Sequence, residues 1–139
     1  MIRKARKTDI PELVKLVKKE KTVEDYPGEY STDVFKQMLK DKDTMLFVIE
    51  EDKKPIAFQE FKIDKSQKRI YLETIIVSKK YRGRGLASTL IKKVENFAKS
   101  KKFKRISFVT RKWNKPMNFL ARKQGFKQKD ELIYWEKML

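Results

Sequence analysis

The chain has 139 residues, a length that fits one domain and leaves no room for two. It contains no Cys and no His, which excludes thiol nucleophiles, disulfides, histidine bases and metal sites built on either residue. Lys and Arg total 36 against 19 Asp and Glu, a net charge of +17. That charge favours a nucleic acid, an anionic membrane surface or a phosphorylated cofactor as partner, or it reflects a lysine-rich solvated surface.

The chain shows no apolar run of about 18 residues, so it predicts no membrane span. Its first residues are charged and no apolar stretch follows them, so we expect no signal peptide. Together with the lack of Cys, these features favour a cytoplasmic location.

In chain order, residues 2–6 form the first predicted strand. Thr8 is expected to cap a helix, in which Ile10, Leu13 and Val17 share one face. A loop over residues 22–30 follows, and Ser31 is expected to cap a second helix.

The middle of the chain predicts an antiparallel meander of strands 45–50, 55–64 and 69–77. A loop over 78–85 leads to a helix over 86–100 and a strand over 105–110, which a helical crossover makes parallel to the strand before it. A helix over 115–124 stops at Gly125, and residues 126–139 predict a last hairpin. The pattern indicates an α/β (α+β) fold with a mixed, mostly antiparallel sheet and about four helices, as a single domain over residues 1–139.

The loop after the third meander strand is the strongest chemical signal. A strand ends at Val77, glycines follow at 83 and 85, and an amphipathic helix begins. Glycines let backbone approach a ligand, and a helix start offers unpaired N–H groups to phosphate. The segment lacks the P-loop and dinucleotide fingerprints, and a plain glycine turn on a basic surface is the alternative.

Residues 82–87 match the pattern Gln/Arg-x-x-Gly-x-Gly/Ala at every fixed position. Here the chain resembles the GNAT N-acetyltransferases, and the order of elements over nearly all 139 residues is similar to that family. The resemblance implies acetyl-CoA as co-substrate, no metal, and splayed parallel strands at the acyl-CoA site. It also implies that backbone near Ile75, Ile76 and Val77 pairs with the pantetheine. The implied pyrophosphate-binding residues are Arg82, Gly83, Arg84, Gly85, Leu86, Ala87 and Ser88.

A second segment is similar to the family's later motif, in which an Asn precedes a Gly-Phe pair by eleven residues. Asn114 and Gly125 have this spacing, and Lys123 matches a common basic position. The resemblance implies that Asn114 and Lys123 help to bind the cofactor, whereas the local sequence also suits Asn114 as a helix cap. Many members place a Tyr acid where this chain has Ala121, so the usual acid is absent and Tyr134 is the predicted substitute.

Glu73 is the predicted base. It lies in a strand expected to be buried on both faces, where a carboxylate is costly without a function or a partner. We expect Ile75 and Val77 to share its face and burial to raise its pKa. The segment resembles a strand of small-amine acetyltransferases whose Glu is the base; a buried ion pair is the alternative.

Acidic and aromatic residues gather in 22–35, which has no Lys or Arg. Such a patch suits a cationic amine, although acids near a helix start also occur for structural reasons alone. The predicted substrate-binding residues are Glu24, Asp25, Tyr26, Glu29 and Tyr30.

The resulting functional prediction is an acetyl-CoA-dependent N-acetyltransferase that acts on a primary amine by direct attack in a ternary complex. The acceptor is predicted to be a polyamine, another small amine, a protein lysine or an N-terminus, with no membrane partner. The alternative is a basic nucleic-acid- or ribosome-associated protein of the same fold with little catalysis. A monomer and a homodimer both fit the sequence.

Overall fold

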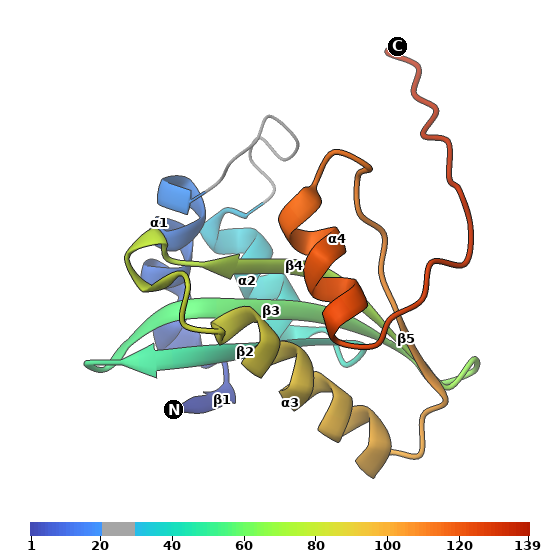
Figure 1. The fold of residues 1–139 in the computed structure, drawn as a ribbon. Helices are drawn as coiled ribbons and strands as arrows, with labels where there is room; N and C mark the ends of the chain where they lie inside the picture. The colour runs from blue at the N-terminus through green and yellow to red at the C-terminus, as the bar shows by residue number, and fades with distance from the viewer. Residues whose placement is uncertain (21–29) are drawn as a thin grey trace. The chain divides into compact units, whose positions relative to one another are not determined.

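The computed structural model describes residues 1–20 and 30–139 (Figure 1). It divides into two compact units, Met1–Phe108 and Val109–Leu139, and each is described by itself. None of the described helices is long and apolar enough to cross a membrane.

Unit Met1–Phe108 contains a five-stranded sheet in the order β1-β2-β3-β4-β5. Neighbouring strands are antiparallel except β4 and β5, which are parallel as predicted from the helical crossover. The described residues therefore confirm the expected mixed, mostly antiparallel sheet with four helices. The strands are β1 (Ile2–Lys4), β2 (Thr44–Glu51), β3 (Lys54–Asp64), β4 (Arg69–Val77) and β5 (Arg105–Ser107), and the helices are α1 (Ile10–Glu20), α2 (Thr32–Lys40), α3 (Leu86–Ser100) and, in the second unit, α4 (Lys115–Lys123).

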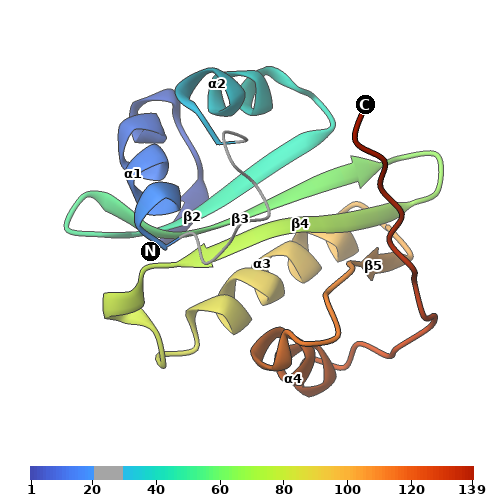
Figure 2. The ribbon, with the colours of Figure 1, turned by 90° about the horizontal axis from the view of Figure 1, so that it is seen from above.

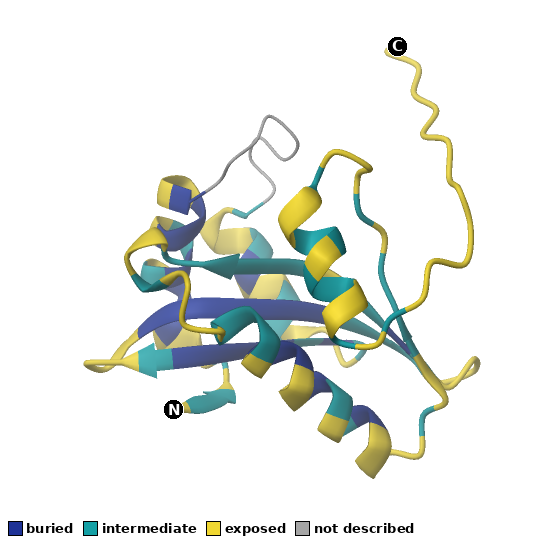
Figure 3. Ribbon diagram, viewed as in Figure 1, coloured by how far each residue is buried: buried dark blue, intermediate teal, exposed yellow. Residues whose placement is uncertain are grey.

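Helices α1 and α2 cover one face of the sheet and α3 covers the other (Figure 2). The first face packs Leu13 of α1 and Phe35 of α2 against Phe58 of β3, all fully buried. On the second face the rings of Phe61 and Phe97 lie 5.7 Å apart, centroid to centroid. Because apolar side chains cover both faces, the central strands β2 and β3 are the most buried part of the sheet (Figure 3).

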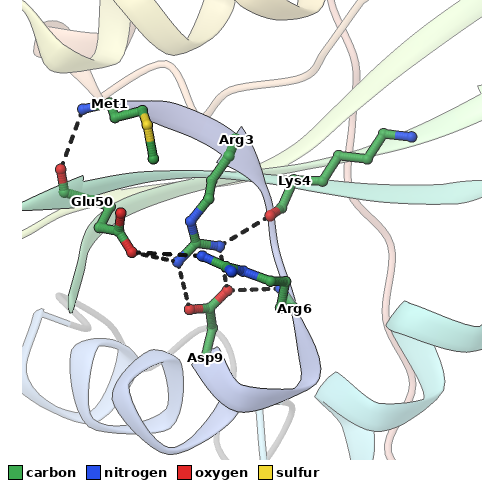
Figure 4. Close-up of polar contacts among 6 residues, drawn as sticks. All are labelled: Met1, Arg3, Lys4, Arg6, Asp9 and Glu50. Carbon is green, nitrogen blue, oxygen red and sulfur yellow. Dashed lines mark hydrogen bonds and ion pairs between the residues drawn. The ribbon is translucent and has the colours of Figure 1, made fainter. Parts of the chain in front are cut away.

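An ion cluster joins β1, the turn before α1, and β2 (Figure 4). The guanidinium of Arg3 donates to both carboxylate oxygens of Asp9 at 2.8 Å and to Glu50 Oε1 at 2.9 Å. The backbone N–H of Arg6 also donates to Asp9, at 2.7 Å. Burial alone would raise the pKa of Asp9, but these hydrogen bonds outweigh it and the pKa is lowered.

Several boundaries differ from the sequence expectation. Thr8 lies inside a 3₁₀ turn, Lys7–Asp9, instead of capping the first helix, and the first strand ends at Lys4. Ser31 does cap α2, since its Oγ accepts a hydrogen bond from the N–H of Val34. The strand predicted over 105–110 ends at Ser107.

The predicted hairpin over residues 126–139 is wrong for this structure. These residues contain neither helix nor strand, and large apolar side chains such as Ile133 and Trp135 are exposed. Alternating apolar residues favour an extended backbone, but a strand forms only when a neighbour satisfies its N–H and C=O groups. None of the five strands of the described sheet pairs with this segment.

Candidate functional site

The glycine-rich loop connects the end of β4 to the start of α3. Gly83 and Gly85 have φ values of +80° and +74°, a region that favours glycine. Gly85 is the N-cap of α3, and no side chain caps this helix. A Cβ placed on either glycine would meet no atom within 4 Å. The start of α3 therefore presents unpaired backbone N–H groups beside open space, which suits a phosphate group.

The two arginines of the loop have different roles. Arg82 Nε donates to the carbonyl of Val77 at 3.1 Å, and its guanidinium pairs with Glu20 Oε2 at 3.0 Å. The Glu20 side chain is 4% exposed, so this pair holds the loop against the end of α1. Arg84 lies over the ring of Tyr81, 5.1 Å from its centroid, and is exposed. Of the two cations predicted for the pyrophosphate, Arg84 is the one that makes no ion pair in the described residues.

In the described residues, β5 pairs with only the first part of β4. β5 pairs with β4 only from Arg69 to Tyr71, whereas β4 continues to Val77. Among the described residues, the stretch containing Ile75, Ile76 and Val77 pairs with β3 alone. This is the divergence expected of splayed parallel strands, and it leads directly into the glycine loop.

Glu73 is exposed, so the expectation that it is buried on both faces is wrong. Glu60 of β3 pairs with Thr74, and Phe61 pairs with Leu72, which leaves Glu73 without a partner. An extra residue of this kind is a β-bulge, and it shifts the alternation of side chains by one position.

The same shift contradicts the expectation that Ile75 and Val77 share a face of the sheet with Glu73. Ile75 and Val77 do not continue the side-chain alternation that begins at Glu73, because the extra residue interrupts it.

The buried carboxylate of this region is Glu60, which the sequence analysis missed. Its side chain is 5% exposed, and burial raises its pKa. The hydroxyl of Tyr30 donates to Glu60 Oε1 at 3.0 Å and also bonds to Thr74 Oγ1. The available signal was the pair Gln59-Glu60 inside the otherwise apolar run 55–61, to which the burial argument used for Glu73 applies equally.

Tyr30 is half-buried among aromatic rings. Its ring centroid lies 5.7 Å from that of Phe35 and 6.4 Å from that of Phe58. Of the residues predicted to bind the substrate, it is the one that the structure describes. The other four, Glu24, Asp25, Tyr26 and Glu29, lie outside the described residues.

Comparison with known proteins identifies the family of this chain. The model of the acetyltransferase (GNAT) family matches residues 10–126. The chain belongs to the acetyltransferase (GNAT) family. Its acyl donor is acetyl-CoA, and the loop from Arg82 to Ser88, which is predicted to bind the pyrophosphate, lies within the matched residues. Among curated protein sequences, none matches the chain significantly.

Solved structures show the same fold at low sequence identity. An aminoglycoside acetyltransferase, AAC(6')-Iy, in complex with the bisubstrate analogue CoA-S-monomethyl-acetylneamine has a TM-score of 0.84 and 22% identity, with coverage of 100% of this chain and 98% of that one. The 6'-N-acetyltransferase AAC(6')-IG from Acinetobacter haemolyticus has a TM-score of 0.80 and 20% identity, with coverage of 100% and 99%. The aminoglycoside acetyltransferase meta-AAC0020 from an uncultured soil metagenomic sample, in complex with trehalose, has a TM-score of 0.82 and 14% identity, with coverage of 100% and 95%.

The remaining candidate residues of this acetyltransferase belong to the second unit. Asn114 caps α4, since its Oδ1 accepts from the N–H of Met117 at 3.3 Å. Lys123 is exposed in the last turn of α4. Tyr134 is exposed, and its hydroxyl donates to Glu136 at 2.8 Å. The cap is one of the two interpretations of Asn114, and the roles of all three residues toward acetyl-CoA stay predictions.

Proposed function

We propose that this acetyltransferase moves an acetyl group from acetyl-CoA to a primary amine of a small polycationic acceptor. The observation that carries the proposal is the glycine loop at the uncapped start of α3, next to the part of β4 that, among the described residues, pairs with β3 and not with β5. A phosphate-binding helix start beside an open strand edge can hold the two parts of one long ligand, a pyrophosphate and an amide-containing arm.

On this proposal the loop binds the pyrophosphate through the backbone N–H groups of residues 85–88, and Arg84 adds a positive charge. Arg82 holds the loop in place through its pair with Glu20. The amide groups of the pantetheine pair with the open edge of β4 along Ile75–Val77. A backbone N–H of the same edge polarises the thioester carbonyl, which is the oxyanion role.

The acceptor amine must lose a proton before it attacks the thioester carbon. Glu73 is the proposed base, because it stands on the β4 bulge, exposed and next to the strand segment assigned to the pantetheine. The C–N bond forms as the C–S bond breaks, and the second proton of the attacking nitrogen passes through water to the leaving thiolate. A chain without Cys cannot form an acetyl-cysteine, so the transfer is direct and both substrates are bound together.

The acceptor class is proposed from charge and from the structural neighbours. Glu73 is exposed on the β4 bulge, and three acids, Glu24, Asp25 and Glu29, precede Tyr30 in the sequence. Such a concentration of negative charge favours an acceptor with more than one ammonium group. The neighbours named above are aminoglycoside acetyltransferases, and aminoglycosides and polyamines share this chemistry.

The test is thiol release from acetyl-CoA with an aminoglycoside, a polyamine, a lysine peptide and a monoamine as separate acceptors. We expect the first two to be acetylated best, and Glu73→Gln to lower turnover by roughly 10²-fold with unchanged acetyl-CoA affinity. Faster transfer to the monoamine would overturn the acceptor class. Full turnover in Glu73→Gln would remove Glu73 from the mechanism.

A further inference from the structure

Glu60 is a buried carboxylate that the proposed chemistry does not use. It lies in the middle of β3, between the buried residues Gln59 and Phe61, and its side chain is 5% exposed. A carboxylate in such a place is costly unless its oxygens have partners. Oε1 accepts the hydrogen bond from Tyr30 at 3.0 Å, and Oε2 lies 3.8 Å from Lys62 Nζ.

The contacts of Glu60 extend to β4 through Tyr30. The hydroxyl of Tyr30 has a single proton, which it donates to Glu60 Oε1. Its hydrogen bond with Thr74 Oγ1 is therefore donated by the threonine. Three side chains thus form one continuous chain of hydrogen bonds in the order Thr74, Tyr30, Glu60; they come from β4, from the residue before the N-cap of α2, and from β3.

This chain ends on the bulge that carries Glu73. Thr74 is the next residue after Glu73, and it is the β4 partner of Glu60 in the ladder. The side-chain amide of Gln59, 1% exposed, donates to the carbonyl of Glu60 at 2.8 Å and to the carbonyl of Thr74 at 3.0 Å. The bulge is thereby held by Gln59 through the backbone and by Tyr30 through the side chain of Thr74.

We propose that Glu60 is a positioning residue for acetyl transfer, which acts through Tyr30 and Thr74 to hold the β4 bulge that presents Glu73 to the acceptor amine. The proposal rests on the proposed role of Glu73 as the base. It assigns a function to a buried carboxylate and explains why Tyr30, predicted to bind the substrate directly, points its hydroxyl at Glu60.

The charged groups that face Glu60 among the described residues are Lys62 from β3 and Glu73 from β4. Burial is the largest influence and raises the pKa of Glu60, and the charge of Glu73 raises it further, whereas hydrogen bonding to Tyr30 and Thr74 and the charge of Lys62 lower it. When Glu60 takes up a proton, its own O–H can donate to Tyr30, and Tyr30 can donate to Thr74. The direction of the chain reverses, but both hydrogen bonds persist, so positioning does not require the negative charge.

This reversibility separates the effect of the hydrogen bonds from that of the charge. Glu60→Gln keeps a donor and an acceptor at this position and removes the charge. Glu60→Leu has a similar volume and removes both, and Tyr30→Phe breaks the chain while keeping the Glu60 carboxylate. We expect Glu60→Gln to keep at least about a third of the parent kcat, and the other two variants to lose roughly 10- to 100-fold with unchanged KM for acetyl-CoA.

A double-mutant cycle tests whether the effect passes through Glu73. Once Glu73→Gln has removed the base, there is nothing left to position, so adding Glu60→Leu should lower kcat by less than about threefold further. A purely structural role of Glu60 would give additive losses and overturn the proposal. Equal losses in Glu60→Gln and Glu60→Leu would overturn it too, because the charge would then be the decisive feature.

Asp9→Asn is the matched control, since Asp9 is an equally buried carboxylate in a hydrogen-bonded cluster away from this bulge. We expect it to lower stability and to leave kcat within about twofold of the parent at a temperature where both are folded. A loss of kcat as large as that of Glu60→Leu would show that destabilisation alone explains the effect.

A carboxyl-carbon NMR titration of Glu60 reads the arrangement without any transferase activity. We expect Glu73→Gln to lower the midpoint of the Glu60 titration and Tyr30→Phe to raise it. If neither variant moves the midpoint, the proposed chain does not exist in solution. If the midpoints move as expected but no amine is acetylated, the positioning network stands and the proposed function fails, so the two failures are distinguishable.

Discussion

Asp9 and Glu60 are both buried carboxylates, and their surroundings shift their pKa values in opposite directions. Asp9 accepts two hydrogen bonds from one guanidinium and one from a backbone N–H, which stabilise its charged form. Glu60 accepts one from a neutral hydroxyl and has a second carboxylate nearby. Donor strength therefore decides which buried acid stays charged at low cost.

Glu60→Gln should make the protein more stable at neutral pH. Because the pKa of Glu60 is raised in the folded state, the folded protein binds the proton more tightly than the unfolded chain does. Ionised Glu60 therefore costs stability that is absent below the unfolded pKa and grows as the pH rises toward the folded pKa. We expect a gain of about 1 kcal/mol at pH 7 and none at pH 3, measured by urea unfolding.

A stability gain at pH 3 as large as that at pH 7 would contradict this explanation. Glu51→Gln, which neutralises an exposed carboxylate at the end of β2, is the control. Its free energy of unfolding should stay within about 0.5 kcal/mol of the parent at both pH values.

The conformation of Gly85 gives a second prediction for a single residue. Gly85→Val places a Cβ in the open space above the loop and strains a backbone with φ of +74°. We expect the affinity for acetyl-CoA, measured by calorimetry, to fall by at least tenfold.

Gly125→Val separates strain from contact with the ligand. Gly125 has a φ of +89° and equally open surroundings, but it ends α4 in the second unit. The Gly125→Val protein should lose about as much stability as Gly85→Val, but its affinity for acetyl-CoA should fall less. An unchanged affinity in a folded Gly85→Val protein would place the pyrophosphate elsewhere.

At the scale of elements, local signals explain the helices and long-range pairing explains the sheet. Ser31 capping and the apolar face of α2 are visible within ten residues of sequence. The bulge at Glu73 depends on how β3 and β4 align, and these strands are joined by a turn that does not determine register at the far end. The exposure of Glu73 therefore could not be derived from the alternation in β4 alone.

The cluster around Arg3 should control how firmly the N-terminal strand is attached. The two carboxylate oxygens of Asp9 accept hydrogen bonds from Arg3, and Asp9→Asn removes the charge of this carboxylate. The pKa of Asp9 is lowered in the folded state. Ionised Asp9 therefore contributes to the free energy of unfolding above the unfolded pKa, about 3.9, and this contribution is lost as the pH falls through the folded pKa.

We expect Asp9→Asn to lower the free energy of unfolding by about 2 kcal/mol at pH 7. The difference between variant and parent should shrink as the pH falls below about 4. If chemical unfolding gave the same loss of stability at pH 7 and pH 2.5, packing and not the charge of Asp9 would explain the effect of this substitution.

At the scale of the whole chain, charge and fold favour different ligands. A net charge of +17 would attract any polyanion, whereas the family identifies acetyl-CoA as the specific ligand. A ligand stabilises a protein only to the extent that it binds the folded state more tightly than the unfolded chain. Thermal unfolding can therefore distinguish acetyl-CoA from a polyanion as the specific ligand.

Acetyl-CoA at 100 times its Kd should add about 2.7 kcal/mol of stability, a rise in Tm of roughly 5–10 °C. An RNA oligonucleotide should give a smaller shift that disappears between 50 and 200 mM salt. The nucleic-acid-binding alternative predicts the reverse, and stabilisation by RNA with none by acetyl-CoA would favour it over the enzyme.

The sequence by itself determined the strand and helix order, the parallel crossover, the glycine loop and the family, because these depend on local patterns: apolar period, turn residues and a short motif. Only the tertiary structure decided which acid is buried, because burial depends on strand register and on what covers each face. In the structure Glu60 is buried and Glu73 is exposed. Arg82 forms an ion pair with Glu20 and is therefore not a free cation. Residues 126–139 do not form the strands that their alternation predicted. Each of these outcomes depends on contacts between segments far apart in the chain, which no local pattern contains.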